Sequence, residues 1–208
     1  NVYLIAVTGR THNMGAYADF ASAESYELVN ELSEEVKSVA EKYTENGLFN
    51  YDKALNAHTD IFTPMYNAVE FSLGETDSTK ANEQLMLEQY LKNKINADLA
   101  ERTYYSGRYA YLCAAGYSTT RLYGMWIGEW SPSWGSKYTM DANVNLQTSS
   151  MNTGNTEITY KGYASFILRQ VPDWEENALA THGFKDAIQA PVHADGDKAV
   201  ITETCYAY

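Results

Sequence analysis

The sequence has few cysteines, few basic residues and no long apolar run. Cys113 and Cys205 lie far apart without a CxxC pattern, so neither a disulfide framework nor a zinc site is expected. The longest apolar candidate, residues 2–7, has the length of a strand, well short of the roughly 20 residues that span a bilayer. The formal net charge of −12 argues against nucleic acid and anionic membranes as partners. Nothing in the sequence predicts a metal or a cofactor.

What is present is the composition of a folded protein with an unusual excess of tyrosine. There are 18 Tyr against 6 Phe and 4 Trp. Tyrosine combines an apolar ring with a polar tip, which suits half-buried, half-wet surfaces such as sugar-binding sites. The alternative is that Tyr simply replaces Phe in the core. Separately, Cys113 lies in an apolar stretch and is expected to be a small buried residue.

The first residues predict that the sequence is an internal piece of a longer polypeptide. Residues 2–8 have the pattern of a buried strand, and a natural N-terminus rarely begins inside one. We therefore expect the remainder of the same polypeptide to be a partner of this chain. The absence of a signal peptide then says little about location.

A polar run at residues 75–80 divides the predicted elements into two groups. Before it we expect the end of a β-containing domain with connecting helices, residues 1–75. The predicted elements there are a strand at 2–8, a loop at 9–15, an amphipathic helix at 21–43 stopped by Asn46-Gly47, a helix at 52–62 interrupted by Pro64, and a strand-like tail at 66–73 ending at Gly74.

After the polar run the pattern becomes mainly helical, residues 76–208. The predicted elements are helices at 81–91, 97–115 and 157–168, a break or new helix start at 172–176, and a loop at 183–197. Between them, residues 117–155 are rich in Gly, Ser, Thr, Asn, Trp and Tyr with little helical periodicity. Structureless stretches of this length are uncommon in compact domains and are usually functional.

Three of the four tryptophans, Trp126, Trp130 and Trp134, fall within nine positions of this stretch. Tryptophans clustered on a loop are hard to bury as an ordinary core and can form stacking platforms for ligand rings. The alternative is that they plug the end of a helical barrel.

Asp141, Asn143 and Asn145 alternate at a two-residue period. In an extended segment alternate residues point to one side, so one carboxylate and two amides would face a common space. Such a row offers donors and acceptors to vicinal hydroxyls. The alternative is a polar loop that faces solvent.

Four short blocks of the sequence, in the same order along the chain, carry a family resemblance. Residues 105–109, Tyr-Ser-Gly-Arg-Tyr, look like a helix opening written Tyr-Gly-Arg-Tyr, and residues 124–126, Gly-Met-Trp, resemble Gly-Ile-Trp. Residues 132–139, Pro-Ser-Trp-Gly-Ser-Lys-Tyr-Thr, resemble Pro-Pro-Trp-Gly-Ser-Asp-Tyr-Thr, and Met140–Asn143 match Leu-Asn-Ile-Asn. Together they resemble glycoside hydrolase family 95, the inverting α-L-fucosidases and related α-L-galactosidases.

This resemblance implies a mainly α fold. Residues 76–208 would be the first helices of an (α/α)6 catalytic barrel of the six-hairpin glycosidase type. Residues 1–75 would be the end of a preceding β-sandwich domain with its linker helices.

The resemblance also implies site residues. The family's two asparagines bind the attacking water, and by position they correspond to Asp141 and Asn143. We expect Trp126, Trp134, Tyr138 and Asn145 to bind the sugar. His193 lies near a polar loop of the family and could hydrogen-bond a sugar hydroxyl; the alternative is a structural or exposed histidine.

The sequence departs from the family at several positions. An amide has no useful basicity, whereas the Asp141 carboxylate can take a proton from water, so Asp141 could serve as a conventional base. The alternative is a divergent or inactive member. Three further departures put fucose specificity in doubt. The family's Asn-Leu-Gln-Gly begins with Arg121 here, and its aspartate before the tyrosine is Lys137. Its aromatic wall, Asn-Tyr-Trp-Pro, is Gln-Thr-Ser-Ser at residues 147–150.

In the family a glutamate acts as general acid, and a distant aspartate helps the two asparagines. No glutamate of this sequence matches that general acid, and no aspartate matches that helper. We expect the acid to follow Tyr208, so that this chain alone would not hydrolyse glycosides.

The predicted function is inverting hydrolysis of a terminal α-linked sugar, such as L-fucose or L-galactose, on oligosaccharides or polysaccharides. The alternatives are a sugar-binding relative without catalysis and a helical scaffold without a ligand. Enzymes of this kind are generally exported, so the expected location is extracellular or at the cell surface.

Overall fold

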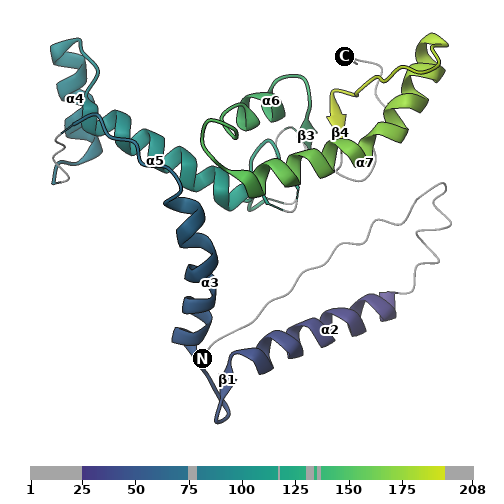
Figure 1. The fold of residues 1–208 in the computed structure, drawn as a ribbon, viewed down its shortest axis with the longest axis horizontal. Coiled ribbons are helices and arrows are strands. Elements are labelled where there is room, and N and C mark those ends of the chain that lie inside the picture. Colours follow the sequence, from purple (N-terminus) through teal and green to yellow (C-terminus); the bar gives the residue numbers. More distant parts are fainter. Residues whose placement is uncertain (1–24, 75–78, 117, 130–133, 135–136, 195–208) are drawn as a thin grey trace. The chain divides into compact units, whose positions relative to one another are not determined.

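The computed structural model describes residues 25–74, 79–116, 118–129, 134 and 137–194 (Figure 1). The predictions for residues 2–15, Trp130 and Cys205 lie outside this part of the chain. Internal contacts divide the chain into two compact units, Asn1–Pro64 and Met65–Tyr208, which are described separately. The polar run in the sequence predicts a division at residues 75–76 instead. That residues 1–75 form the last part of a β-sandwich domain stays a prediction.

The first unit contains helix α2, Ser25–Lys42, where an amphipathic helix was predicted. Leu32, Val36 and Tyr43 are half-buried along one stripe, and the acidic residues between them are exposed. Apolar residues at three- and four-residue steps share one helix face, which explains the stripe.

A short hairpin follows α2 and was missed in the sequence. Strand β1, Thr44–Glu45, pairs antiparallel with β2, Leu48–Phe49. Asn46 and Gly47 join them with φ of 53° and 76°, the left-handed values that a type I′ turn needs. We had assigned Asn46-Gly47 only as a helix stop.

Helix α3 runs from Tyr51 to Tyr66, longer than the predicted helix at 52–62. Asn50 caps its start, since the Asn50 Oδ1 accepts a hydrogen bond from the Lys53 amide at 2.9 Å. Pro64 lies inside the last turn and does not end the helix. The missing Pro64 amide removes one helix hydrogen bond, and the helix continues to Tyr66.

The second unit begins with two helices joined by a short turn. Helix α4 spans Asn82–Lys92 and helix α5 spans Ala97–Ala114, as predicted within one or two residues. Asn93 ends α4 in the left-handed conformation at φ 46°. Asn96 caps α5 by accepting the Leu99 amide at 3.0 Å, which satisfies one of the free donors of the first turn.

Residues 67–74 do not form the strand that their alternation predicted. The backbone of this segment bonds to side chains of α5 in place of a partner strand. The Tyr105 hydroxyl accepts from the Phe71 amide at 2.9 Å and donates to the Phe71 carbonyl at 3.1 Å, and Glu101 accepts from the Leu73 amide. Backbone polar groups need partners, and here α5 supplies them.

Arg108, one turn after Tyr105, holds the last residues of α3, just before this segment. Its guanidinium donates to the carbonyls of Tyr66 at 3.0 Å, Met65 at 2.7 Å and Gly154. Arg108 is only 7% exposed. Met65 and Tyr66 are the last residues of α3, where free carbonyls carry partial negative charge, so a buried cation is well placed there.

Helix α7 is one continuous helix, Glu157–His182 (Figure 1). The predicted break at 172–176 is therefore wrong: Pro172 lies inside α7, and its side chain is exposed. Gly183, at φ 70°, ends the helix in the left-handed conformation typical of a C-terminal glycine.

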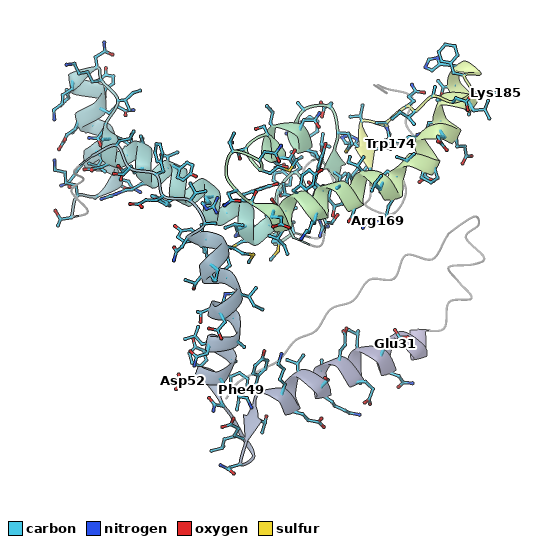
Figure 2. All side chains as sticks on the ribbon, viewed as in Figure 1. Glu31, Phe49, Asp52, Arg169, Trp174 and Lys185 are labelled. Carbon is cyan, nitrogen blue, oxygen red and sulfur yellow. The ribbon has the colours of Figure 1, made fainter. Side chains whose placement is uncertain are left out.

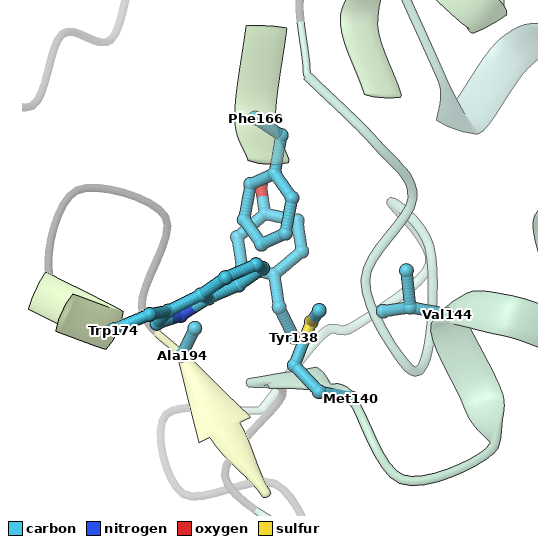
Figure 3. Packing of buried hydrophobic residues seen from close by; sticks show 6 residues of the cluster. All are labelled: Tyr138, Met140, Val144, Phe166, Trp174 and Ala194. Carbon is cyan, nitrogen blue, oxygen red and sulfur yellow. The ribbon is translucent and has the colours of Figure 1, made fainter. Parts of the chain in front are cut away.

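The core of the second unit lies between α7 and a small antiparallel pair of strands (Figure 3). Strand β3 is Tyr138–Thr139 and strand β4 is His193–Ala194. Phe166 and Trp174 of α7 are buried against this pair (Figure 3). Figure 2 labels Trp174 on α7. The cluster consists of Tyr138, Met140, Val144, Phe166, Trp174 and Ala194.

The prediction of a mainly α protein is confirmed, since the strands that the structure describes are all two residues long. The arrangement as an (α/α)6 barrel stays a prediction. None of the described helices is both long and apolar enough to cross a membrane.

Candidate functional site

The loop that carries Asp141 and Asn143 is built from β3, a turn and helix α6, Asn143–Thr148. It is not extended at residues 141–145, so the expected common face of Asp141, Asn143 and Asn145 does not arise from strand alternation. Residues two apart on a helix point to different sides. The physical reason is that Val144 and Thr148, four residues apart and both buried, give this segment a buried helical face, on which the Thr148 hydroxyl donates to the Val144 carbonyl at 2.7 Å.

The predicted water-binding pair lies at the start of α6. Asp141 is exposed in the turn, and Asn143 is the half-buried first residue of the helix. Asn145 is exposed and its side-chain amide donates to the Met140 carbonyl at 3.4 Å. Asp141 is thus open to water and to a ligand, while Asn145 is engaged with its own turn.

Strand pairing brings His193 to this loop from far along the sequence. In the register of β3 and β4, His193 lies opposite Thr139. The Met140 amide also donates to the Val192 carbonyl at 2.6 Å. Strands β3 and β4 therefore bring His193 close to the turn that carries Asp141. From the sequence, only the family resemblance placed His193 near the sugar.

The predicted aromatic binders have different environments. Trp126 and Trp134 are 61% and 74% exposed, so their rings are accessible. Tyr138 is buried in the core, with its ring centroid 4.6 Å from that of Phe166 and the Arg121 guanidinium 6.0 Å away. The structure therefore gives the Tyr138 ring a packing position in the core, whereas the two tryptophans can stack on a ligand.

A pocket of about 800 Å³ lies beside this loop and was not predicted. Its walls come from α5, the segment at 69–71, the loop at 120–126 and the turn at 147–156. Its larger aromatic members are Phe71, Tyr104, Tyr111, Tyr123 and Trp126. Such a volume and a mainly apolar lining with a few polar groups are typical of small-molecule sites.

Gly124 explains how Trp126 reaches this pocket. Gly124 has a positive φ of 60°, and an added Cβ would lie 2.5 Å from the Trp126 ring. Only glycine permits the ring to fold back over the backbone here. The Gly-Met-Trp block therefore positions one aromatic wall.

Tyr111 lines the pocket and supplies a phenol. Burial raises the pKa of Tyr111, so it stays protonated at neutral pH. Its hydroxyl makes no hydrogen bond of good geometry, although Thr159 is close enough to affect its pKa. It can therefore act as a neutral donor or acceptor.

A model of the glycosyl hydrolase family 95 catalytic domain matches residues 50–194, well over half of the chain. The chain belongs to glycosyl hydrolase family 95. The family 95 match begins next to the first residue of α3 and ends in β4, and it includes every residue predicted for the site, from Trp126 to His193. A comparison with curated proteins found no match.

Family 95 membership gives the activity class, glycoside hydrolysis. The part of the chain that the structure describes contains no group of three or more His, Cys, Asp or Glu side chains placed to hold a metal ion. The chemistry available at the Asp141 loop is that of a carboxylate, amides and an imidazole.

Proposed function

We propose that this protein removes a terminal α-linked sugar, such as L-fucose or L-galactose, from oligosaccharides or polysaccharides with inversion at the anomeric carbon. The observation that supports the proposal is Asp141, an exposed carboxylate in the turn before α6, with Asn143 as the first residue of that helix. The resemblance to family 95 assigns this pair of positions to the attacking water.

Asp141 is proposed to be the base. A carboxylate can accept a proton from water as the water attacks the sugar, whereas an amide cannot. Asn143 would hold and orient that water through its side-chain amide. His193, placed opposite Thr139, would hydrogen-bond a sugar hydroxyl, and the exposed rings of Trp126 and Trp134 would stack on sugar faces.

Inversion also needs a general acid on the opposite face of the sugar. We propose that this acid lies outside the present sequence, on the remainder of the polypeptide. Assays therefore use the full-length protein. The proposed location is extracellular or at the cell surface, where glycan substrates are found.

The test is the Asp141→Asn variant, assayed with a panel of aryl glycosides that includes α-L-fucoside and α-L-galactoside. Turnover should fall by about three orders of magnitude or more, because the base is lost. Asp186→Asn is the matched control: Asp186 is exposed and adopts a left-handed φ of 57°, which asparagine also accepts. Near-full activity of Asp141→Asn would reject Asp141 as the base.

A second candidate is a sugar-binding relative that has lost catalysis. The substitution of aspartate for asparagine at position 141 and the absence of an aromatic wall at residues 147–150 favour it. In that case the full-length protein would bind saccharides while no glycoside in the panel is cleaved.

A further inference from the structure

We propose that Asn46 is a site of spontaneous covalent modification, at which the side-chain amide is converted to a carboxylate through a cyclic imide, and that opening of the β1–β2 hairpin controls the rate. Asn46 is the only asparagine of the sequence that precedes a glycine. Asn46 and Gly47 are both exposed, at the tip of the hairpin. The inference involves neither the sugar nor the hydrolytic loop, so it stands apart from the proposed function.

The reaction needs only the peptide nitrogen of Gly47 and water. This nitrogen gives up its proton and attacks the side-chain carbonyl carbon of Asn46, Cγ. A bond forms between the nitrogen and Cγ, the bond from Cγ to Nδ2 breaks, and Nδ2 leaves as ammonia with the proton. Water then opens the imide. Cleavage at Cγ gives aspartate, and cleavage at the backbone carbonyl gives isoaspartate, in which the main chain runs through Cγ.

Glycine at position 47 leaves the attacking nitrogen accessible. A Cβ built at Gly47 would meet no atom within 4 Å, so the space around this peptide is open to water, and glycine has no Cβ of its own to shield the nitrogen. Asn93 and Asn155 provide a comparison within the chain. Both are exposed and have left-handed φ values of 46° and 47°, but the residues that follow them carry side chains.

The closed hairpin restrains the reaction. A type I′ turn has ψ of about +30° at its first central residue, which is Asn46 here. At this ψ the Gly47 nitrogen points away from the Asn46 side chain, on the opposite side of the Cα–C bond from Cβ. The attack therefore needs the Asn46 backbone to rotate, and that rotation opens the turn.

Few contacts oppose this opening. Strands β1 and β2 are two residues long and exposed, and an isolated two-stranded hairpin is only marginally stable in water. The Glu45 carboxylate connects the hairpin to α3, since it accepts from the Asn50 side-chain amide at 2.9 Å and pairs with Lys53 at 3.0 Å. Exposed ion pairs contribute little to stability, so the turn opens readily.

The isoaspartate product changes the start of α3. It adds one carbon to the main chain of the turn, so the register of β1 and β2 cannot be kept. Asn50 depends on this register, because its Nδ2 donates to Glu45 while its Oδ1 accepts the Lys53 amide at 2.9 Å as the cap of α3. We therefore expect the cap to loosen in the modified protein.

Peptide mapping by mass spectrometry tests the site. The full-length protein is kept at mildly alkaline pH, and the conversion of each asparagine is measured in one digest. We expect loss of the Asn46 amide, with aspartate and isoaspartate both formed, while Asn93 and Asn155 keep their amides. Conversion of Asn46 no faster than that of Asn93 would overturn the proposal.

Two lysine variants test whether hairpin opening controls the rate. Lys53→Met removes the partner of Glu45 and should raise the conversion rate at Asn46 about twofold or more. Lys37→Met is the matched control, since it removes an exposed ion pair with Glu34, at 2.6 Å, from α2, and it should leave the rate unchanged. Equal rates in the two variants would overturn control by the hairpin.

Hydrogen exchange of the Lys53 amide separates the effect of the added main-chain carbon from that of the new charge. Asn46→Asp carries the carboxylate on a normal backbone, and aspartate also fits a type I′ turn. The Lys53 amide should exchange faster in the modified protein than in freshly purified Asn46→Asp or the unmodified protein. Equal exchange in all three would overturn the coupling to α3.

Discussion

At the scale of single residues, Arg108 connects three parts of the second unit. Its guanidinium bonds to the last two carbonyls of α3 and to the Gly154 carbonyl while almost entirely buried. Hydrogen bonds to a charged group contribute more than neutral ones, and carbonyls left unpaired in the interior are costly. Arg108, the arginine of the Tyr-Ser-Gly-Arg-Tyr block, therefore has a structural role.

We therefore expect Arg108→Met to lower the free energy of unfolding by about 2–4 kcal/mol, since the stem still packs but three carbonyls lose their donor. Urea unfolding measures the change. Lys94→Met, at an exposed position, is the control and should change the free energy by less than about 0.5 kcal/mol. A small effect at Arg108 would show that water satisfies these carbonyls.

Tyr111 makes the free energy of unfolding depend on pH in the alkaline range. Burial raises the pKa of its phenol above the ordinary value of 10.0, so the unfolded state loses the proton first. The stabilising contribution is complete below pH 10 and falls as the pH rises toward the folded-state pKa. Between about pH 9 and 11.5, the stability of Tyr111→Phe should decline less steeply than that of the unmodified protein. Parallel slopes in urea titrations would contradict this assignment.

At the scale of elements, α5 organises the segment at 67–73 through the side chains of Glu101, Tyr105 and Arg108. These residues recur at four- and three-residue steps, so they lie on one face of the helix. They bond to the chain in reverse order: Arg108 to Met65, just before the segment, Tyr105 to Phe71 and Glu101 to Leu73. The segment therefore runs along α5 in the opposite direction.

Tyr105→Phe should loosen this segment without unfolding the unit. The hydroxyl makes two bonds to Phe71, and their loss exposes that amide to exchange. We expect the hydrogen-exchange rate of the Phe71 amide to rise about fivefold or more, since roughly 1 kcal/mol per bond is lost. Amides of α7 provide the internal reference. If Phe71 exchanges as before, other contacts hold the segment.

The helices of the chain were predictable where periodicity is strong and unbroken. α2, α4 and α5 follow their apolar patterns to within a few residues. α3 and α7 were predicted too short because each contains a proline. Pro64 falls in a last turn, and Pro172 lies on an exposed side of α7 while Phe166 and Trp174 are buried. Tertiary packing therefore holds α7 together across its proline.

The strand prediction for residues 66–73 failed for a different reason. Alternation of apolar and polar residues predicts which side chains face the protein, but it does not identify the partner of the backbone. Here the partner is a helix side chain. The Asn46-Gly47 hairpin, by contrast, carried a recognisable turn signal in the sequence.

The site was partly predictable. The family resemblance assigns Asp141 and Asn143 to the site, and local composition assigns the tryptophans to it; both assignments stay predictions. The pocket was not predictable, because Phe71, Tyr104, Trp126 and Gln147 come from four segments that only the fold brings together. The glycine in the interior of α5 was the one sequence signal that could have indicated it.

At the scale of the whole molecule, the family 95 match joins α3, α5, the tryptophan loop and β4 into one catalytic-domain sequence. The net charge of −12 suits a neutral glycan substrate better than a polyanion, because it would repel anionic partners.

We propose above that the full-length protein hydrolyses an α-linked sugar with inversion. Proton NMR of the reaction at early times, with an aryl α-glycoside that the protein cleaves, measures the configuration of the first sugar released before it mutarotates. Inversion predicts that the β-anomer appears first and the α-anomer only later. Release of the α-anomer first would contradict direct attack by a water held at Asp141 and Asn143.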